Sequence, residues 1–230
     1  MKYRNLFFDL DDTIWAFSRN ARDTFEEVYR KYSFERYFDS FDHYYTIYQQ
    51  RNTELWIEYG EGKITKDELN WQRFSYPLQA VGVEDETLAE KFSEDFFAII
   101  PTKSGLMPYA KEVLEYLAPK YNLYILSNGF RELQSRKMRS AGVDIYFKKV
   151  ILSEDLGVLK PWPEIFNFAL SATQSELRES LMIGDSWEAD ITGAHGVGMH
   201  QVFYNVTERT AFPFLPTYHI YSLKELMDLL

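Results

Sequence analysis

The sequence contains no cysteine, and this absence excludes several kinds of site. A chain without thiols forms no disulfide, holds no zinc ion through thiolates and uses no cysteine nucleophile. The same absence fits a reducing compartment. Any reactive site in this chain must therefore use other side chains.

A long apolar segment is also missing. Residues 1–4 lead directly into an apolar strand, without the apolar region of a secretory signal, and no later run is long enough to span a bilayer. We therefore expect a cytoplasmic protein that has no membrane partner.

Basic residues are fewer than acidic ones: the chain has 25 lysines and arginines and 35 aspartates and glutamates, which gives a formal net charge of −10. Such a balance disfavours a nucleic-acid polymer or an anionic membrane surface as the partner. It does not attract a phosphorylated metabolite from a distance either. An anion site would have to be built locally, from a metal ion, lysine and backbone N–H groups.

What the chain does contain predicts an α/β fold with an insertion. The 230 residues suit a core with a smaller second domain. Residues 15–101 show four amphipathic helical stretches, rich in aromatic residues, with no strand between them. From residue 102 onward strands alternate with helices, which indicates a doubly wound, mostly parallel sheet. We expect residues 1–14 and 102–230 to form this core, with an all-α helical bundle, residues 15–101, inserted after the first strand.

Two expectations concern details of these elements. The third helix of the insertion should open at a capping box beginning with Thr65 and be disturbed near Pro77. In the core, strands at residues 200–204 and 218–220 should be peripheral.

The segment from Asn5 to Thr13 reads as a buried strand that runs into an acidic turn. The period of an extended strand places Asp9 and Asp11 on one side and Asp12 on the other. Two carboxylates this close repel each other unless a cation lies between them or one keeps its proton. Mg²⁺ prefers such oxygen ligands. The alternative is a group of acids that cap the following helix.

Three further polar clusters follow later strands. In Ser127-Asn128-Gly129, a hydroxyl and a glycine turn could hold a phosphate, or could form an ordinary turn. Lys160 stands before proline on a stiff loop, where it could meet an anion or simply face solvent. A second acidic cluster, with Asp185 and Asp190, could bind a metal ion or complement a helix dipole.

These clusters, in this order, resemble the four motifs of the haloacid dehalogenase (HAD) superfamily, and the insertion resembles its helical-bundle cap. The matching residues are Asp9-x-Asp11-x-Thr13, Ser127-Asn128-Gly129, Lys160-Pro161 and Gly184-Asp185-x-x-x-x-Asp190. The resemblance implies a Rossmann-like core and a Mg²⁺-dependent phosphatase. Such an enzyme would hydrolyse phosphomonoesters through an aspartyl-phosphate intermediate.

The resemblance also implies a role for each residue. Asp9 would be the nucleophile, Asp11 the general acid and base, and Lys160 the group that neutralises the phosphate. Thr13 would fix the turn, and Ser127 would bind phosphate with the backbone of Asn128 and Gly129. The implied metal ligands are Asp9, Asp11, Asp185 and Asp190, although Asp190 could instead orient its neighbours. Trp15, beside the acidic turn, is a further candidate for substrate contact.

The substrate expectation is a small phosphorylated metabolite. The turns at Ser127–Phe130 and Gly184–Ser186 look like those of bacterial pyrimidine 5′-nucleotidases, which suggests a nucleoside 5′-monophosphate. For the oligomeric state we expect either a monomer or a homodimer. The alternatives are a sugar phosphatase or phosphomutase of the same superfamily, and a response-regulator-like phosphoacceptor switch. Switch modules are shorter and have no helical insertion. Dehalogenases of the superfamily have no acid at the Asp11 position, so an acid there favours phosphate chemistry.

Overall fold

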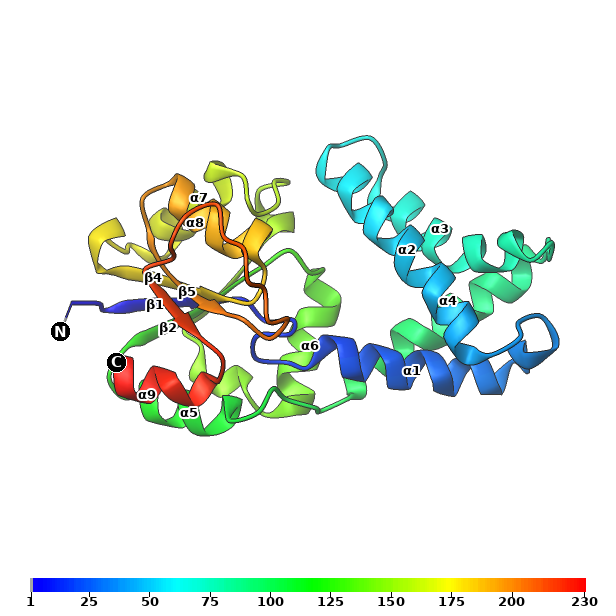
Figure 1. Cartoon of the computed structure of the whole chain (residues 1–230), viewed down its shortest axis with the longest axis horizontal. Coiled ribbons are helices and arrows are strands. Elements are labelled where there is room, and N and C mark those ends of the chain that lie inside the picture. Colours follow the sequence, from blue (N-terminus) through cyan, green and yellow to red (C-terminus); the bar gives the residue numbers. More distant parts are fainter. Residues whose placement is uncertain (1) are drawn as a thin grey trace. The chain divides into compact units, whose positions relative to one another are not determined.

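The computed structural model describes residues 2–230 and separates into two compact units. One unit is formed by the chain up to Ser18 together with Lys103–Leu230, and the other by Arg19–Thr102. The expected boundaries were after residues 14 and 101. Figure 1 shows the elements of each unit, coloured along the sequence.

The first unit contains a six-stranded, all-parallel sheet in the order β3-β2-β1-β4-β5-β6. The strands are β1 Asn5–Phe8, β2 Asn122–Ser127, β3 Lys149–Leu152, β4 Ser180–Gly184, β5 His200–Tyr204 and β6 Tyr218–Ile220. The predicted α/β fold with a parallel sheet is confirmed. The strand order reverses between β1 and β4, and ligands of open α/β sheets bind beyond the carboxyl ends of strands at such a point.

Helices cover both faces of this sheet. They are α5 Ala110–Leu117, α6 Arg131–Ala141, α7 Pro163–Thr173, α8 Thr192–Gly196 and α9 Leu226–Leu229. Apolar side chains of α7 and α8, among them Phe166 and Ala194, pack with Phe7 and Met182 of the central strands. Figure 1 shows α5 and α9 on the opposite face. The sheet is therefore doubly wound, as expected.

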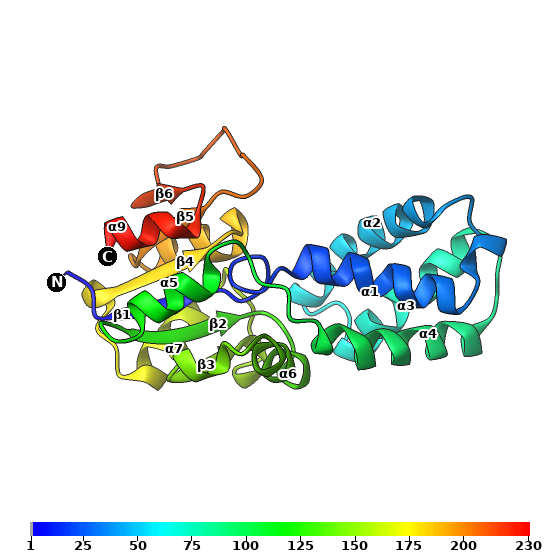
Figure 2. The same ribbon diagram turned by 90° about the horizontal axis from the view of Figure 1, so that it is seen from below.

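Only one of the last two strands is peripheral. In Figure 2, β6 lies at the edge of the sheet, whereas β5 lies between β4 and β6 and is buried over Gln201–Tyr204. The prediction that both strands are peripheral is wrong for β5. Both edges of β5 are hydrogen-bonded, one to β4 and the other to β6, and its side chains alternate between the two faces of the sheet, as in any interior strand of a parallel sheet.

The second unit is a helical bundle with an aromatic core. It contains most of α1 Phe17–Lys31, together with α2 Phe41–Gly60, α3 Lys66–Ala80 and α4 Glu86–Ile99. Phe25 lies at its centre, with the rings of Tyr48 and Phe96 at centroid distances of 4.1 and 4.2 Å. None of the helices between residues 2 and 230 is both long and apolar enough to cross a membrane.

Helix α3 contains Pro77, near which we expected the helix to be disturbed. The capping box of Thr65 and Glu68 is present, but the helix continues through Pro77 to Ala80. Proline in a helix interior costs about 3 kcal/mol. Pro77 and Leu78 are both buried, and their packing offsets this local cost.

Candidate active site

The acidic turn leaves β1 abruptly. Asp9 still belongs to the sheet, since its N–H donates to the carbonyl of Ile183 in β4 at 2.9 Å. Asp12 has a φ of 57°, which ends the extended backbone. Its carboxylate accepts hydrogen bonds from the backbone N–H and the hydroxyl of Ser18, at 2.8 and 2.6 Å. The capping interpretation of the acids is therefore correct for Asp12.

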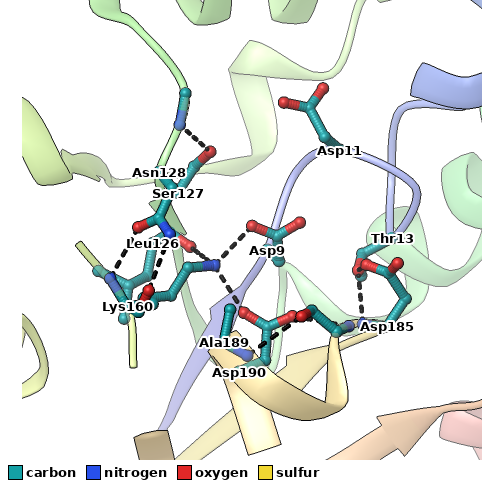
Figure 3. Close-up of polar contacts among 12 residues, drawn as sticks. Asp9, Asp11, Thr13, Leu126, Ser127, Asn128, Lys160, Asp185, Ala189 and Asp190 are labelled. Carbon is teal, nitrogen blue, oxygen red and sulfur yellow. Dashed lines mark hydrogen bonds and ion pairs between the residues drawn. The ribbon is translucent and has the colours of Figure 1, made fainter. Parts of the chain in front are cut away.

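Three carboxylates and one ammonium group meet beyond the ends of β1 and β4. Oxygens of Asp9, Asp185 and Asp190 all lie within 4.8 Å of one another. Lys160 Nζ donates to Asp9 Oδ1 and to Asp190 Oδ1, at 2.6 Å each, and to the carbonyl of Leu126 at 2.8 Å (Figure 3). The structure thus brings together four of the residues that the motifs predicted, although 151 positions separate Asp9 from Lys160.

Local contacts fix the second acidic cluster. The Thr13 hydroxyl donates to Asp185 Oδ1 at 2.8 Å and accepts from the Asp185 N–H at 3.1 Å. A Cβ atom on Gly184 would lie 2.2 Å from Asp190 Oδ2. Only glycine at this position allows the Asp190 carboxylate to approach the end of β4 so closely.

The turn after β2 positions Lys160. The Asn128 side chain donates to the Lys160 carbonyl at 3.0 Å and accepts from the Lys160 N–H at 2.8 Å. The backbone N–H of Gly129 donates to Ser127 Oγ at 3.1 Å. The contacts of Asn128 therefore involve its side chain, whereas the motif resemblance had assigned a role to its backbone.

The electrostatics of the group follow from its burial. Burial raises the pKa of Asp9 to about 7. The Lys160 ammonium has the opposite effect on this pKa, but burial is the larger of the two. Burial, with the charges of Asp9 and Asp190, raises the pKa of Asp185 to about 8. For Lys160, burial alone would lower the pKa, but the carboxylates of Asp190 and Asp9 outweigh it and raise the pKa above its ordinary value.

This arrangement fits Mg²⁺. Three carboxylates with one ammonium group carry two excess negative charges when ionised, and the donor set consists of hard oxygen ligands. Burial raises the pKa values of Asp9 and Asp185, and a cation held between these carboxylates would favour their charged forms. Asp9, Asp185 and Asp190 are the residues that would hold the ion.

A bound cation should therefore stabilise the protein more at high pH. In the metal-free protein the raised pKa values of Asp9 and Asp185 mean that the folded state binds protons that the unfolded chain has released. The free energy of unfolding should then fall as the pH rises from about 4 to 8. At pH 8.5, Mg²⁺ at about 100 times its Kd should raise the unfolding temperature by at least about 5 °C, and by less at pH 6.

Thermal unfolding with Mg²⁺ or with a chelator, at both pH values, checks this prediction. The Asp12→Asn variant is the control, because Asp12 is an acid of the same turn that lies outside the group, and it should show the wild-type shift. An equal shift at pH 6 and pH 8.5 would mean that protons and the cation do not compete for these carboxylates.

The carboxylate of Asp11 lies outside the acidic group. Lys137 Nζ donates to its Oδ1 and Gln134 Nε2 to its Oδ2, each at 2.8 Å. The strand period was expected to place Asp11 with Asp9, but β1 ends at Phe8 and Asp11 forms an isolated bridge with Trp15. Among the described residues, the carboxylates that lie close enough together to share a metal ion are those of Asp9, Asp185 and Asp190. The Asp11 carboxylate, which was expected to be a further metal ligand, is not part of this group.

Trp15 is fully buried. Its indole N–H donates to the carbonyl of Lys103 at 3.1 Å, and Lys137 Nζ lies 4.7 Å from the ring centroid. Contact between Trp15 and a substrate stays a prediction, and the indole has no exposed surface through which to make it.

The motifs did not reveal Gln134 and Lys137. These residues lie one turn apart on α6, on the same helix face as the buried Met138. Two polar residues within an apolar stripe, directly after the Ser127-Asn128-Gly129 turn, are the signal in the sequence that could have identified them.

Comparison with known proteins identifies the family. A model of the haloacid dehalogenase-like hydrolases matches residues 3–198. The chain belongs to this family. The hydrolase is 33% identical to the HAD-hydrolase YfnB of Bacillus subtilis, over 100% of this chain and 96% of that protein. It is 31% identical to the pyrimidine 5′-nucleotidase YjjG of Escherichia coli, over 100% of this chain and 99% of that one.

Solved structures agree with this assignment. The structure of YfnB bound to magnesium superposes with a TM-score of 0.88 at 29% identity, covering 100% of this chain and 99% of YfnB. The resemblance inferred from the four motifs is therefore confirmed, and with it the α/β core of a HAD hydrolase.

Proposed function

We propose that this hydrolase is a Mg²⁺-dependent phosphatase that acts through an aspartyl-phosphate on a small phosphorylated metabolite, such as a nucleoside 5′-monophosphate. The observation that carries the proposal is the buried Lys160 ammonium, which joins Asp9 to Asp190 beside a third carboxylate. A structural ion pair would need one carboxylate for one lysine. The surplus of negative charge instead suits a site that receives a cation and a phosphate together.

In the first step, a carboxylate oxygen of Asp9 attacks phosphorus and the ester P–O bond breaks. Asp11 gives its proton to the leaving alkoxide, which departs as an alcohol. The Ser127 hydroxyl donates to a phosphoryl oxygen, and Lys160 offsets the charge of the phosphate. When bound, Mg²⁺ supplies positive charge that offsets the repulsion between the phosphate and the three carboxylates.

In the second step, Asp11 takes a proton from water as the water oxygen attacks phosphorus. The P–O bond to Asp9 breaks, inorganic phosphate leaves and the Asp9 carboxylate is restored. Asp11 is protonated again and ready for the next substrate. One carboxyl group thus serves both halves of the reaction.

Full-length similarity to pyrimidine 5′-nucleotidases supports a nucleoside monophosphate as the substrate. A panel of deoxypyrimidine, purine and hexose monophosphates separates the alternatives. We expect the highest kcat/KM with a pyrimidine nucleotide, whereas a preference for hexose phosphates would favour a sugar phosphatase. Interconversion of two sugar phosphates without net phosphate release would indicate a phosphomutase.

Removal of the metal ion tests the proposed reaction itself. With p-nitrophenyl phosphate, a chelator should reduce phosphate release by at least about 100-fold, because the uncompensated carboxylates then repel the substrate. Added Mg²⁺ should restore the rate. Full activity in the chelator would contradict the proposal, and a single stoichiometric phosphorylation without turnover would indicate a phosphoacceptor switch.

A further inference from the structure

One buried amide links the two groups to which the proposed reaction assigns proton transfer and phosphate binding. The Gln134 side chain, on α6, has no exposed surface. Its Nε2 donates to Asp11 Oδ2 and also to Ser127 Oγ, each at 2.8 Å. A single nitrogen atom thus contacts both Asp11 and Ser127.

The chemistry of the partners decides which way this amide points. In this structure both carboxylate oxygens of Asp11 accept, one from Lys137 Nζ and the other from Gln134 Nε2, so the NH₂ group of Gln134 faces Asp11 in the form in which Asp11 acts as the base. Both of its N–H bonds are then in use, and Oε1 has no hydrogen-bond partner among residues 2–230. A buried acceptor without a partner destabilises the folded state, because it has lost its hydrogen bond to water. Gln134 therefore makes its two donated hydrogen bonds at a cost to the stability of the folded state.

The two donors around Ser127 determine what its hydroxyl can do. Ser127 Oγ accepts from the Gly129 N–H at 3.1 Å and from Gln134 Nε2 at 2.8 Å. A hydroxyl oxygen has two acceptor positions and one O–H to donate. Both acceptor positions are filled, while no residue in the described part of the chain accepts the Ser127 proton. The hydroxyl is left as a donor only.

Gly129 leaves room for this arrangement. A Cβ atom at Gly129 would lie 2.0 Å from Gln134 Nε2 and 2.5 Å from the amide carbon. Any larger residue would push the amide away from Ser127. Glycine at position 129 is therefore needed to leave space for the Gln134 amide, a requirement that the sequence did not reveal.

We propose that Gln134 is a positioning residue that fixes Ser127 as a one-way donor to a phosphoryl oxygen and holds Asp11 beside it. The inference rests on the proposed function, because it assumes that Ser127 meets a phosphate. Gln134 itself does not touch the substrate. Its Nε2 donates to Ser127 Oγ. With Gly129 N–H as the second donor, this bond orients the hydroxyl so that the Ser127 O–H points toward the phosphoryl oxygen.

Two substitutions at Gln134 test this role in the Mg²⁺-loaded, full-length protein. Gln134→Met keeps the length of the side chain but donates nothing, and Gln134→Glu keeps the shape but accepts where the amide donated. With p-nitrophenyl phosphate as substrate and inorganic phosphate as inhibitor, Gln134→Met should raise KM and the inhibition constant about tenfold, with a smaller change in kcat. Gln134→Glu should raise both about 100-fold, because its carboxylate accepts the Ser127 proton and repels the phosphate.

A double-mutant cycle with Ser127→Ala separates positioning from packing. If Gln134 acts through Ser127, adding Gln134→Met to Ser127→Ala should change the inhibition constant by less than about twofold. Independent, multiplying effects would overturn the inference. Should Gln134→Met fail to fold, Gly129→Ala displaces the same amide from another direction and should raise the inhibition constant likewise.

The matched control is Gln201→Met, which makes the same change at a buried glutamine whose side chain bonds Met199 and Thr217. It should leave KM at the wild-type value. If the wild-type protein neither hydrolyses the aryl phosphate nor binds inorganic phosphate, the proposed function falls. If the wild type is active and both Gln134 variants keep its KM and inhibition constant, only the role of Gln134 falls.

Discussion

Replacement of Asp9 by asparagine should lower the rate of phosphate release by at least about a thousandfold. An amide oxygen is a poor nucleophile and cannot form the aspartyl-phosphate. The fold should survive, because the new amide oxygen can still accept the hydrogen bond that Lys160 gives to Asp9 Oδ1 at 2.6 Å. The measurement is release of nitrophenol and phosphate from p-nitrophenyl phosphate, together with trapping of phosphorylated protein by acid quench.

Asp12→Asn provides the matched control for this result. It makes the same chemical change three positions further along the same turn, but Asp12 contacts Ser18 and not the acidic group. An amide oxygen can still cap α1, and asparagine tolerates the positive φ of this position. This variant should keep at least about half of the wild-type activity. If Asp9→Asn instead retained more than about a tenth of the wild-type rate, Asp9 would not be the nucleophile.

Lys160→Met should destabilise the metal-free protein more than any surface substitution. Lys160 is the ammonium that contacts both Asp9 and Asp190, and both carboxylates are buried. Removing one partner of a buried ion pair costs about 3–5 kcal/mol in the free energy of unfolding. Mg²⁺ should recover part of that loss, because it supplies the missing positive charge. Activity should fall at least about 100-fold even with Mg²⁺ present.

Two further variants separate stability from catalysis. Lys149→Met removes an exposed lysine of the same unit, whose Nζ donates to the Ala172 carbonyl, and should change the free energy of unfolding by less than about 0.5 kcal/mol. The double variant Lys160→Met/Asp190→Asn removes one charge of each sign, so it should regain stability but not activity. Urea unfolding in a chelator is the measurement. A metal-free Lys160→Met protein as stable as wild type would show that Lys160 does not offset the buried carboxylates.

The sequence was most informative where a local rule applies. The limits of α2, Phe41–Gly60, follow from its aromatic spacing and its final glycine, and β3 and β5 follow from short apolar runs. A local rule failed where the backbone turned. Asp11 leaves the strand period because β1 ends at Phe8 and the chain turns at Asp12. The helix around Pro77 continues to Ala80, and a disturbance of its backbone there stays a prediction.

The sequence by itself determined the family, the parallel α/β core and four of the residues that gather beyond the ends of the strands, namely Asp9, Lys160, Asp185 and Asp190. Each of these depends on short-range patterns: apolar runs that form buried strands, and polar residues that follow directly after them. Only the tertiary structure decided which partner each polar side chain takes. The pairing of Asp11 with Lys137 and Gln134, and the close approach of Asp190 that Gly184 permits, join segments or backbone conformations that no local pattern specifies. Partner choice depends on distances of 2 to 3 Å between side chains, and packing of the whole unit sets these distances.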